Sequence, residues 1–315
     1  MPPKILFVYF LMFGTLFSQD SAYNLGDIKN TVNQLPNNPE KLLIRGNTEL
    51  DSGNILLAEE IFNKALSLDP SFAPAIKGLS KLSLHKGDLK KANEYAIDAV
   101  QKDEDLREWS NSITKISENI QNGNRYVQQG LFNEAIKSYE LILSDHPYFP
   151  DAEFYKGLTR FRQKDIGGAA EYFKRALKIY PDHQKARKGL DNVTKQFLNA
   201  GNKSYKQGDI SKATDYYEKA LEFDSDFYLA HFQLGVLQKK QGKSKAAIKS
   251  LQKVLEIKPD HDKTWFTLGT AYESDGNNQK AIIHYNKAIE INTEYIKAYG
   301  NLGKLYTDIG DYVAA

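Results

Sequence analysis

Apolar residues along positions 262–295 fall at the spacing of two short amphipathic helices. They are Trp265, Leu268, Ala271 and Tyr272 in the first helix, and Ala281, Tyr285 and Ala288 in the second. Gly276 separates the two groups, and glycine favours the left-handed conformation that follows a helix C-terminus. Asn277 can then cap the second helix. The pattern predicts an antiparallel helix pair that approaches closely at the small residues Gly269 and Ala281.

The turn glycine of this pair recurs with a fixed period. Stretches of the form Gly-x-x-x-x-Ala begin at Gly53, Gly87, Gly130, Gly208, Gly242, Gly276 and Gly310. Four of the six intervals are 34 residues long, and the others are 43 and 78. A period near 34 residues indicates a helical repeat array. The acidic residues after the turn position predict N-caps of the second helices; they are Asp88, Asp165, Asp209 and Asp311.

Eight units share this register, with starts at residues 39, 73, 116, 150, 194, 228, 262 and 296. The first alanine of the second helix is present in all eight, and the glycine at the helix contact in seven. Ser80 replaces that glycine once, Ala96 replaces an aromatic residue and Lys164 replaces a turn glycine. The order of a large residue, Leu-Gly, Tyr, a turn glycine, Ala, an aromatic residue, Ala and Pro resembles the tetratricopeptide repeat (TPR) family.

The resemblance implies an all-α fold, a right-handed TPR superhelix of antiparallel helix pairs with a concave inner face. Two inserts interrupt the period, REWSNSITK after residue 106 and QKARKGLDNV after residue 183. Both keep an apolar helical rhythm and contain no proline, which favours extended first helices over the alternative of surface loops. We therefore expect two extended helices that divide the array into three blocks, 39–115, 116–193 and 194–315.

The N-terminal residues 1–22 differ from the rest of the chain. Lys4 precedes an apolar run from Ile5 to Phe17, and small polar residues follow. This order is typical of a secretory signal peptide, and the run is shorter than the about 20 residues of a transmembrane helix. We expect export to a periplasm, a secretory lumen or the extracellular space, with an uncleaved N-terminal anchor as the alternative. Residues 23–38 are expected to be a linker.

Composition and motifs give no sign of catalysis. The chain has 41% hydrophobic and 26% charged residues, a net charge of +2 and no cysteine. It contains no Gly-x-Ser-x-Gly, phosphate-binding loop, His-Glu-x-x-His or dinucleotide motif, so we expect no enzyme, no cofactor and no metal site. His146, His183 and His261 fall in inter-repeat turns and are interpreted as solvated. The basic run 239–253 lacks arginine and interleaved aromatics, so no nucleic-acid partner is expected.

The resemblance implies that first helices line a peptide-binding concave face. In this register the candidate partner-binding residues are Asn47, Asn124, Asn202, Phe154, Phe161, Tyr205, Phe232, Phe266 and Lys263. Asparagine both donates and accepts, which suits a peptide backbone, and lysines beside aromatics suit an acidic segment. The alternatives are that the asparagines help to pack or cap helices and that several aromatics belong to the core. The family's carboxylate clamp matches at only two of five positions in the third block.

These residues predict an exported TPR scaffold that binds peptide segments or partner subunits in concave grooves. One alternative is an exported co-chaperone that binds unfolded clients, although the chain lacks the His-Pro-Asp of a J domain. Another is the targeting arm of a larger enzyme. The last unit ends just after the turn Gly310-Asp311, and we expect that the sequence continues beyond residue 315. The partner, the exact compartment and the oligomeric state are left open by the sequence.

Overall fold

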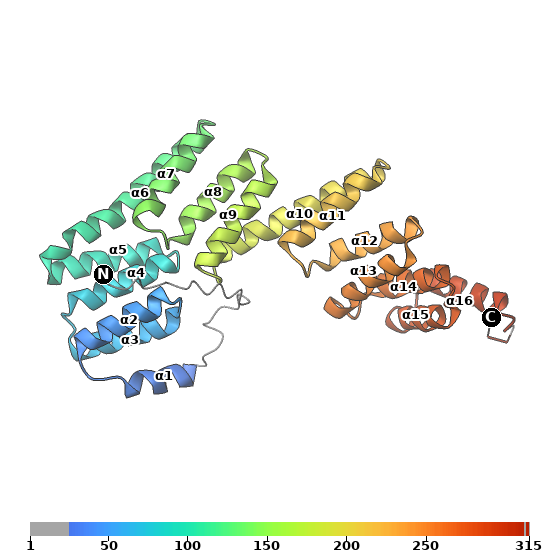
Figure 1. The fold of residues 1–315 in the computed structure, drawn as a ribbon, viewed down its shortest axis with the longest axis horizontal. Coiled ribbons are helices and arrows are strands. Elements are labelled where there is room, and N and C mark those ends of the chain that lie inside the picture. Colours follow the sequence, from blue (N-terminus) through green and yellow to red (C-terminus); the bar gives the residue numbers. More distant parts are fainter. Residues whose placement is uncertain (1–24, 312, 315) are drawn as a thin grey trace, which may run out of the picture. The chain divides into compact units, whose positions relative to one another are not determined.

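The computed structural model describes residues 25–311, 313 and 314, and all regular structure in these residues is helical (Figure 1). The predicted signal peptide, residues 1–22, lies outside the described residues. The helices are α1 (Leu25–Gln34), α2 (Pro39–Asp51), α3 (Ile55–Leu68), α4 (Ala73–His85), α5 (Leu89–Lys102), the 3₁₀ helix η2 (Glu104–Leu106), α6 (Arg107–Gln128), α7 (Phe132–Asp145), α8 (Pro150–Arg162), α9 (Ile166–Ile179), α10 (Gln184–Lys206), α11 (Ile210–Phe223), α12 (Tyr228–Lys240), α13 (Ser244–Ile257), α14 (Asp262–Ser274), α15 (Asn278–Ile291) and α16 (Ile296–Asp308).

The expected all-α fold of antiparallel helix pairs is confirmed. Helices of 13 and 14 residues alternate within α2–α5 and within α12–α15, as the 34-residue period requires. The predicted N-caps Asp88, Asp165, Asp209 and Asn277 form, since each side chain accepts a hydrogen bond from the backbone N–H three residues later. Asp311 accepts the same kind of bond from the Ala314 N–H, but no helix follows it in the described residues.

A glycine in each of several first helices allows close contact with a large side chain of the second helix. A Cβ on Gly201 would lie 2.5 Å from the Tyr217 ring, and one on Gly269 would lie 2.6 Å from the Tyr285 ring. Both tyrosines are buried. The helix pairs therefore depend on glycine at these positions, because any larger residue would push the second helix outward.

Both inserts lie within long helices, which confirms the interpretation as extended first helices. The helix α6 has 22 residues and α10 has 23. The apolar side chains in the inserts are buried on one face, with Ile113 at 0% and Ala186 at 0% exposure. The surface-loop alternative is thus wrong. The grouping of repeats into three blocks stays a prediction.

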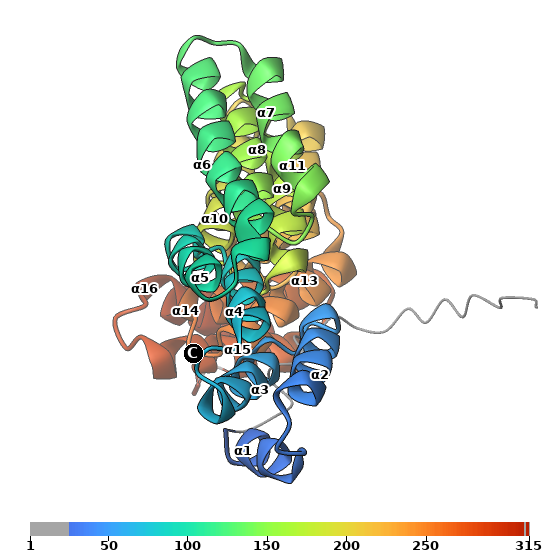
Figure 2. The same ribbon diagram turned by 90° about the vertical axis from the view of Figure 1, so that its left-hand side faces the viewer.

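The expectation of a linker at residues 23–38 needs correction, because α1 occupies most of this segment. Ile28 and Val32 lie one turn apart and are buried in the same cluster as α3. The Lys64 ammonium group donates to the Val32 and Leu35 carbonyls at 2.9 and 2.7 Å, and so caps the end of α1. Figures 1 and 2 show α1 beside α3.

The described residues form two compact units. The first comprises residues up to Thr159 together with Lys174–Gln184, and the second comprises Arg160–Phe173 together with the residues from Lys185 onward. Each unit has its own apolar core: Phe62 and Tyr139 are among the largest buried side chains of the first, and Tyr217 and Tyr285 of the second.

Candidate functional site

Two of the three candidate asparagines are tied to the second helix of their own repeat. The Tyr139 hydroxyl donates to Asn124 Oδ1 at 3.0 Å, and the Tyr217 hydroxyl donates to Asn202 Oδ1 at 2.8 Å. Burial raises the pKa of Tyr217 to about 12, so its hydroxyl remains a donor at neutral pH. The amide oxygens of Asn124 and Asn202 therefore hold helix pairs together.

Asn47 has a different environment in the first repeat. The residue that corresponds to Tyr139 and Tyr217 is Phe62, which has no hydroxyl. Asn47 is half-buried and its side chain makes no hydrogen bond with the described residues. Its amide is thus available to a ligand.

Asn47 lines a pocket of about 210 Å³, here called the first-unit pocket. Its walls come from α2, α4 and the end of η2, and the lining residues are Leu43, Asn47, Pro74, Lys77, Gly78, Lys81 and Leu106. Only Asn47 among these residues belongs to the sequence-predicted site. The pocket combines an amide and two lysines with apolar walls.

The two lysines of this pocket have no acidic partner in the described part of the chain. Lys77 and Lys81 lie one turn apart on α4, and both are half-buried. Burial and, to a smaller extent, the charge of Lys81 lower the pKa of Lys77. The Lys77 ammonium lies 5.4 Å from the centroid of the Trp109 ring, which can favour the cation without neutralising it.

A second, open pocket of about 600 Å³ lies between α5 and α6 of the same unit. It is lined by Leu89, Lys90, Asn93, Glu94, Thr114 and Ser117. Its lysine already has a carboxylate nearby, because Lys90 Nζ lies 3.9 Å from Glu94 Oε1 on the exposed helix surface. This pocket therefore offers less uncompensated charge than the first-unit pocket.

In the second unit, Tyr205, Phe232 and Phe266 form what we call the aromatic row. They come from the successive first helices α10, α12 and α14, and all three are half-buried. The Phe232 ring meets the edge of His261 at a centroid distance of 5.2 Å, and the Phe266 ring packs on Tyr295 at 5.1 Å. Each ring thus contributes to packing between repeats and keeps part of its surface exposed.

Two lysines border the aromatic row. Lys240 Nζ lies 5.1 Å from the Tyr205 ring centroid, and Lys263 is exposed at the start of α14. Neither makes an ion pair with a carboxylate in the described residues. The row therefore has apolar surface with positive charge at its edge.

The structure places the other two predicted aromatics separately. Phe154 belongs to the first unit, where it is half-buried and its ring lies 5.8 Å from that of His183. Phe161 is half-buried and belongs to the second unit. These two residues are not part of the aromatic row as defined here.

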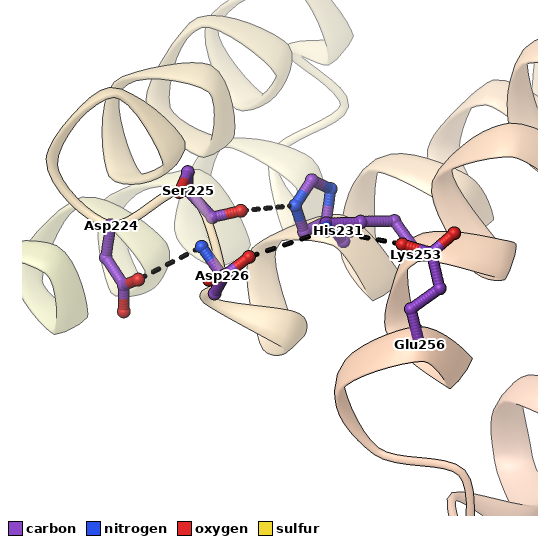
Figure 3. A network of polar contacts seen from close by, with 6 residues as sticks. All are labelled: Asp224, Ser225, Asp226, His231, Lys253 and Glu256. Carbon is purple, nitrogen blue, oxygen red and sulfur yellow. Dashed lines mark hydrogen bonds and ion pairs between the residues drawn. The ribbon is translucent and has the colours of Figure 1, made fainter. Parts of the chain in front are cut away.

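The basic run 239–253 is partly engaged within the protein. Lys239 donates to Thr270 Oγ1 at 2.9 Å, and its pKa is lowered by burial. Lys253 lies 3.5 Å from Asp226 Oδ1 and 3.2 Å from Glu256 Oε2, as Figure 3 shows. In the first turns of α12, His231 contacts the carbonyl oxygen of Ser225, which lies in the loop before that helix, at 2.8 Å (Figure 3). The run is therefore not a uniform free patch.

The interpretation of the turn histidines as solvated is wrong for the first unit. His146 is 2% exposed, and its ring makes edge-to-face contacts with the rings of Trp109 and Tyr148. His183 is 5% exposed and its Nε2 lies 2.7 Å from the buried Asp151 Oδ1. Both follow a helix end and fold back onto the core, which sequence spacing alone does not reveal. No group of three metal-ligating side chains occurs in the described residues.

Helix pairs repeated along the chain, each with a first helix that carries candidate binding groups, define a helical repeat protein. Models of the tetratricopeptide repeat match more than half of the sequence, at residues 42–72, 120–183, 201–242, 228–261 and 262–295. The chain belongs to the tetratricopeptide repeat family. Among the described helices, none is both long and apolar enough to span a bilayer.

Several solved structures resemble the chain at low sequence identity. The TPR domain of P58(IPK) is 16% identical over 90% of this chain and 92% of that chain, with a TM-score of 0.39. YrrB, described as a TPR protein with an unusual peptide-binding site, is 18% identical over 76% and 96%, with a TM-score of 0.33. MamA is 21% identical over 58% and 94%, with a TM-score of 0.30. No curated protein matches the chain significantly.

Proposed function

We propose that this protein is a non-enzymatic scaffold that binds segments of partner proteins along the first helices of its repeats. TPR units supply the framework, because each pair presents its first helix on one face of the stack. The described residues offer surfaces with apolar area and uncompensated positive charge. Such surfaces suit extended or helical segments with acidic character.

The aromatic row carries this proposal. Tyr205, Phe232 and Phe266 retain exposed ring surface on three successive first helices, and Lys240 and Lys263 border them without carboxylate partners. Large aromatic side chains at a partly exposed site supply much of the binding energy in protein interfaces. Lysines at the rim add preference for acidic segments and faster association.

A selection from a random peptide display library tests the proposal with the full chain. We expect enriched peptides to combine apolar and acidic residues, and to bind less tightly to the Phe232→Ala, Phe266→Ala double variant by about tenfold or more. Lys263→Glu should weaken the same peptides without loss of helix content, because this side chain is exposed. Far-UV circular dichroism checks that both variants fold.

Ile283→Ala is the matched control. Ile283 is a large apolar side chain on the second helix α15, and it is 61% exposed. Its replacement should leave peptide binding unchanged. Enrichment of no peptide, or equal loss in the control and in the double variant, would overturn the scaffold proposal.

We further propose that the scaffold acts after export. The apolar run from Ile5 to Phe17 behind Lys4 supports a cleaved signal peptide, with an uncleaved anchor as the alternative. Expression with a C-terminal tag, followed by fractionation and mass spectrometry of the tagged chain, tests this. A tagged protein that begins at Met1 and stays with cytosolic markers would refute export.

A further inference from the structure

We propose that the first-unit pocket binds the carboxylate of an acidic side chain in a protein partner. This inference rests on the proposed scaffold function and specifies the chemistry that one of its surfaces selects. The pocket is distinct from the aromatic row, which lies in the other unit. Support for carboxylate binding comes from the set of unpaired polar groups in the walls of this pocket.

The first observation is a pair of uncompensated like charges. Lys77 and Lys81 are four residues apart on α4, where like charges destabilise a helix. Both line the pocket, both are half-buried, and neither has an acidic partner in the described part of the chain. A carboxylate in the pocket gives both ammonium groups a hydrogen-bonding counter-charge, and such charge-assisted bonds are the stronger kind.

The second observation is the free amide of Asn47. In two later repeats the residue at this position accepts from a tyrosine hydroxyl, namely Asn124 from Tyr139 and Asn202 from Tyr217. Phe62 stands in the tyrosine position of the first repeat, so Asn47 is left without that bond. Its NH₂ group is a third donor for a bound carboxylate.

The third observation is a wall that η2 builds, with Trp109 of the first insert beside it. Leu106 closes one side of the pocket, and Trp109 holds the Lys77 ammonium over its ring. The Trp109 Nε1–H donates to Ser80 Oγ at 3.1 Å, and the Ser80 hydroxyl donates to the Ala92 carbonyl at 2.7 Å. These bonds fix Trp109 to α4 and α5, so the ring that contacts the Lys77 ammonium is held in place beside the pocket.

Size and surroundings indicate one side chain as the occupant. The pocket of about 210 Å³ is smaller than the roughly 300–1,000 Å³ of small-molecule sites. Leu43, Pro74 and Leu106 give it apolar walls, which lower the local dielectric constant and strengthen attraction between lysine and carboxylate. A neutral amide of the same shape as glutamate gains only the weaker attraction between the ammonium charges and its dipole.

An array of peptide pairs, each with glutamate or glutamine at one position, tests the inference on the full chain. We expect the tightest glutamate peptide to bind about tenfold better than its glutamine partner, measured by fluorescence anisotropy. Lys77→Met and Lys81→Met should each weaken it by about tenfold, since methionine keeps an apolar stem without the charge. Leu106→Trp, which fills the pocket and changes no charge, should also abolish binding.

Lys137→Met is the matched control, because Lys137 is exposed on α7 and has no carboxylate partner in the described residues. It should leave affinity unchanged. Binding of the glutamate and glutamine peptides with equal affinity, or equal loss with Lys137→Met, would overturn the pocket assignment. If peptides bind only through Phe232 and Phe266, the scaffold function stands and the pocket inference falls. If no peptide binds, both fall.

Discussion

Lys164 holds a backbone conformation that glycine holds in the equivalent turns. Its φ is 65°, and it is the one non-glycine residue with positive φ in the part of the chain that the structure describes. The turn needs this conformation, because the Asp165 N–H donates back to the Arg160 carbonyl and the Lys164 N–H to the Phe161 carbonyl. The sequence departure at Lys164 therefore leaves the turn intact and adds local strain.

Lys164→Gly is expected to stabilise the protein. A left-handed lysine costs about 1–2 kcal/mol, and glycine loses about 0.5–1 kcal/mol of chain entropy, so the net gain lies between about 0 and 1.5 kcal/mol. Urea unfolding followed by circular dichroism measures it. Lys164→Ala should give no such gain, because alanine keeps the strain. Gly130→Lys should destabilise, since its φ is 76°. A loss of stability in Lys164→Gly would refute the strain argument.

His146 illustrates a buried group whose ionisation opposes folding. Neither ring nitrogen has a hydrogen-bond partner in the described residues. Burial lowers the pKa of His146, and the nearby Ser112 backbone and the Asp145 charge offset this only in part. Burial also lowers the pKa of His85, His261 and His284.

We therefore expect the free energy of unfolding to fall as pH drops below about 6.5, the value for an unfolded histidine. In this pH window histidines bind protons in the unfolded chain but not in the folded chain. The free energy of unfolding therefore keeps falling until the pH reaches the lowered pKa values of the folded histidines. His146→Phe should reduce the change of unfolding free energy with pH by up to about 1.4 kcal/mol per pH unit. Urea titrations at several pH values between 7.5 and 5 measure it.

Ile142→Val is the control for this measurement, because Ile142 is buried in the same cluster and does not ionise. It should lower stability by a similar amount at every pH. An unchanged slope in His146→Phe would show that His146 does not contribute to the pH dependence.

At the scale of elements, the second repeat shows how departures from the repeat pattern compensate one another. Ser80 replaces the contact glycine, and the residue sixteen positions later is Ala96 instead of an aromatic. Sixteen residues also separate Gly123 from Tyr139 and Gly201 from Tyr217, where the ring meets the glycine. Because residue 96 is alanine, there is room for the Ser80 side chain. The Ser80 hydroxyl donates a hydrogen bond to the Ala92 carbonyl and accepts one from the Trp109 Nε1–H.

The sequence predicted the helix pairs because turn glycines, caps and contact glycines recur in one register. It missed α1, because Ile28, Val32 and Leu35 form a short apolar stripe among polar residues and match no repeat. The burial of His146 and His183 was also missed, since turns between repeats look alike whether they fold outward or inward. These features depend on contacts between elements that the period does not describe.

The candidate site was predictable only in part for the same reason. The first-helix register named Asn47 and the members of the aromatic row. It did not name Lys77, Lys81 or Leu106, because their pocket forms only where η2 and the insert in α6 meet the first two repeats. Lysines without nearby acidic residues on α4 were the one sequence signal that could have indicated it.

For the whole molecule, a stack of repeats predicts local rather than global responses to damage. Each repeat contacts mainly its neighbours, so stability is approximately a sum of local terms. The two compact units, each with its own buried core, are consistent with this behaviour. The contact glycines allow a sharp test, because one methyl group changes a single helix pair.

Gly269→Ala should loosen α14 and α15 and leave the first unit unchanged. The added Cβ would lie 2.6 Å from the Tyr285 ring, and such overpacking costs about 1–3 kcal/mol. Native-state hydrogen exchange should accelerate in α14 and α15, and less so in α13 and α16, while α2–α5 keep their rates. Gly300→Ala is the matched control, since a Cβ there meets nothing within 4 Å and alanine favours the helix α16. Equal acceleration in every described helix would instead show that the chain opens as one cooperative unit, because only global unfolding exposes distant repeats together.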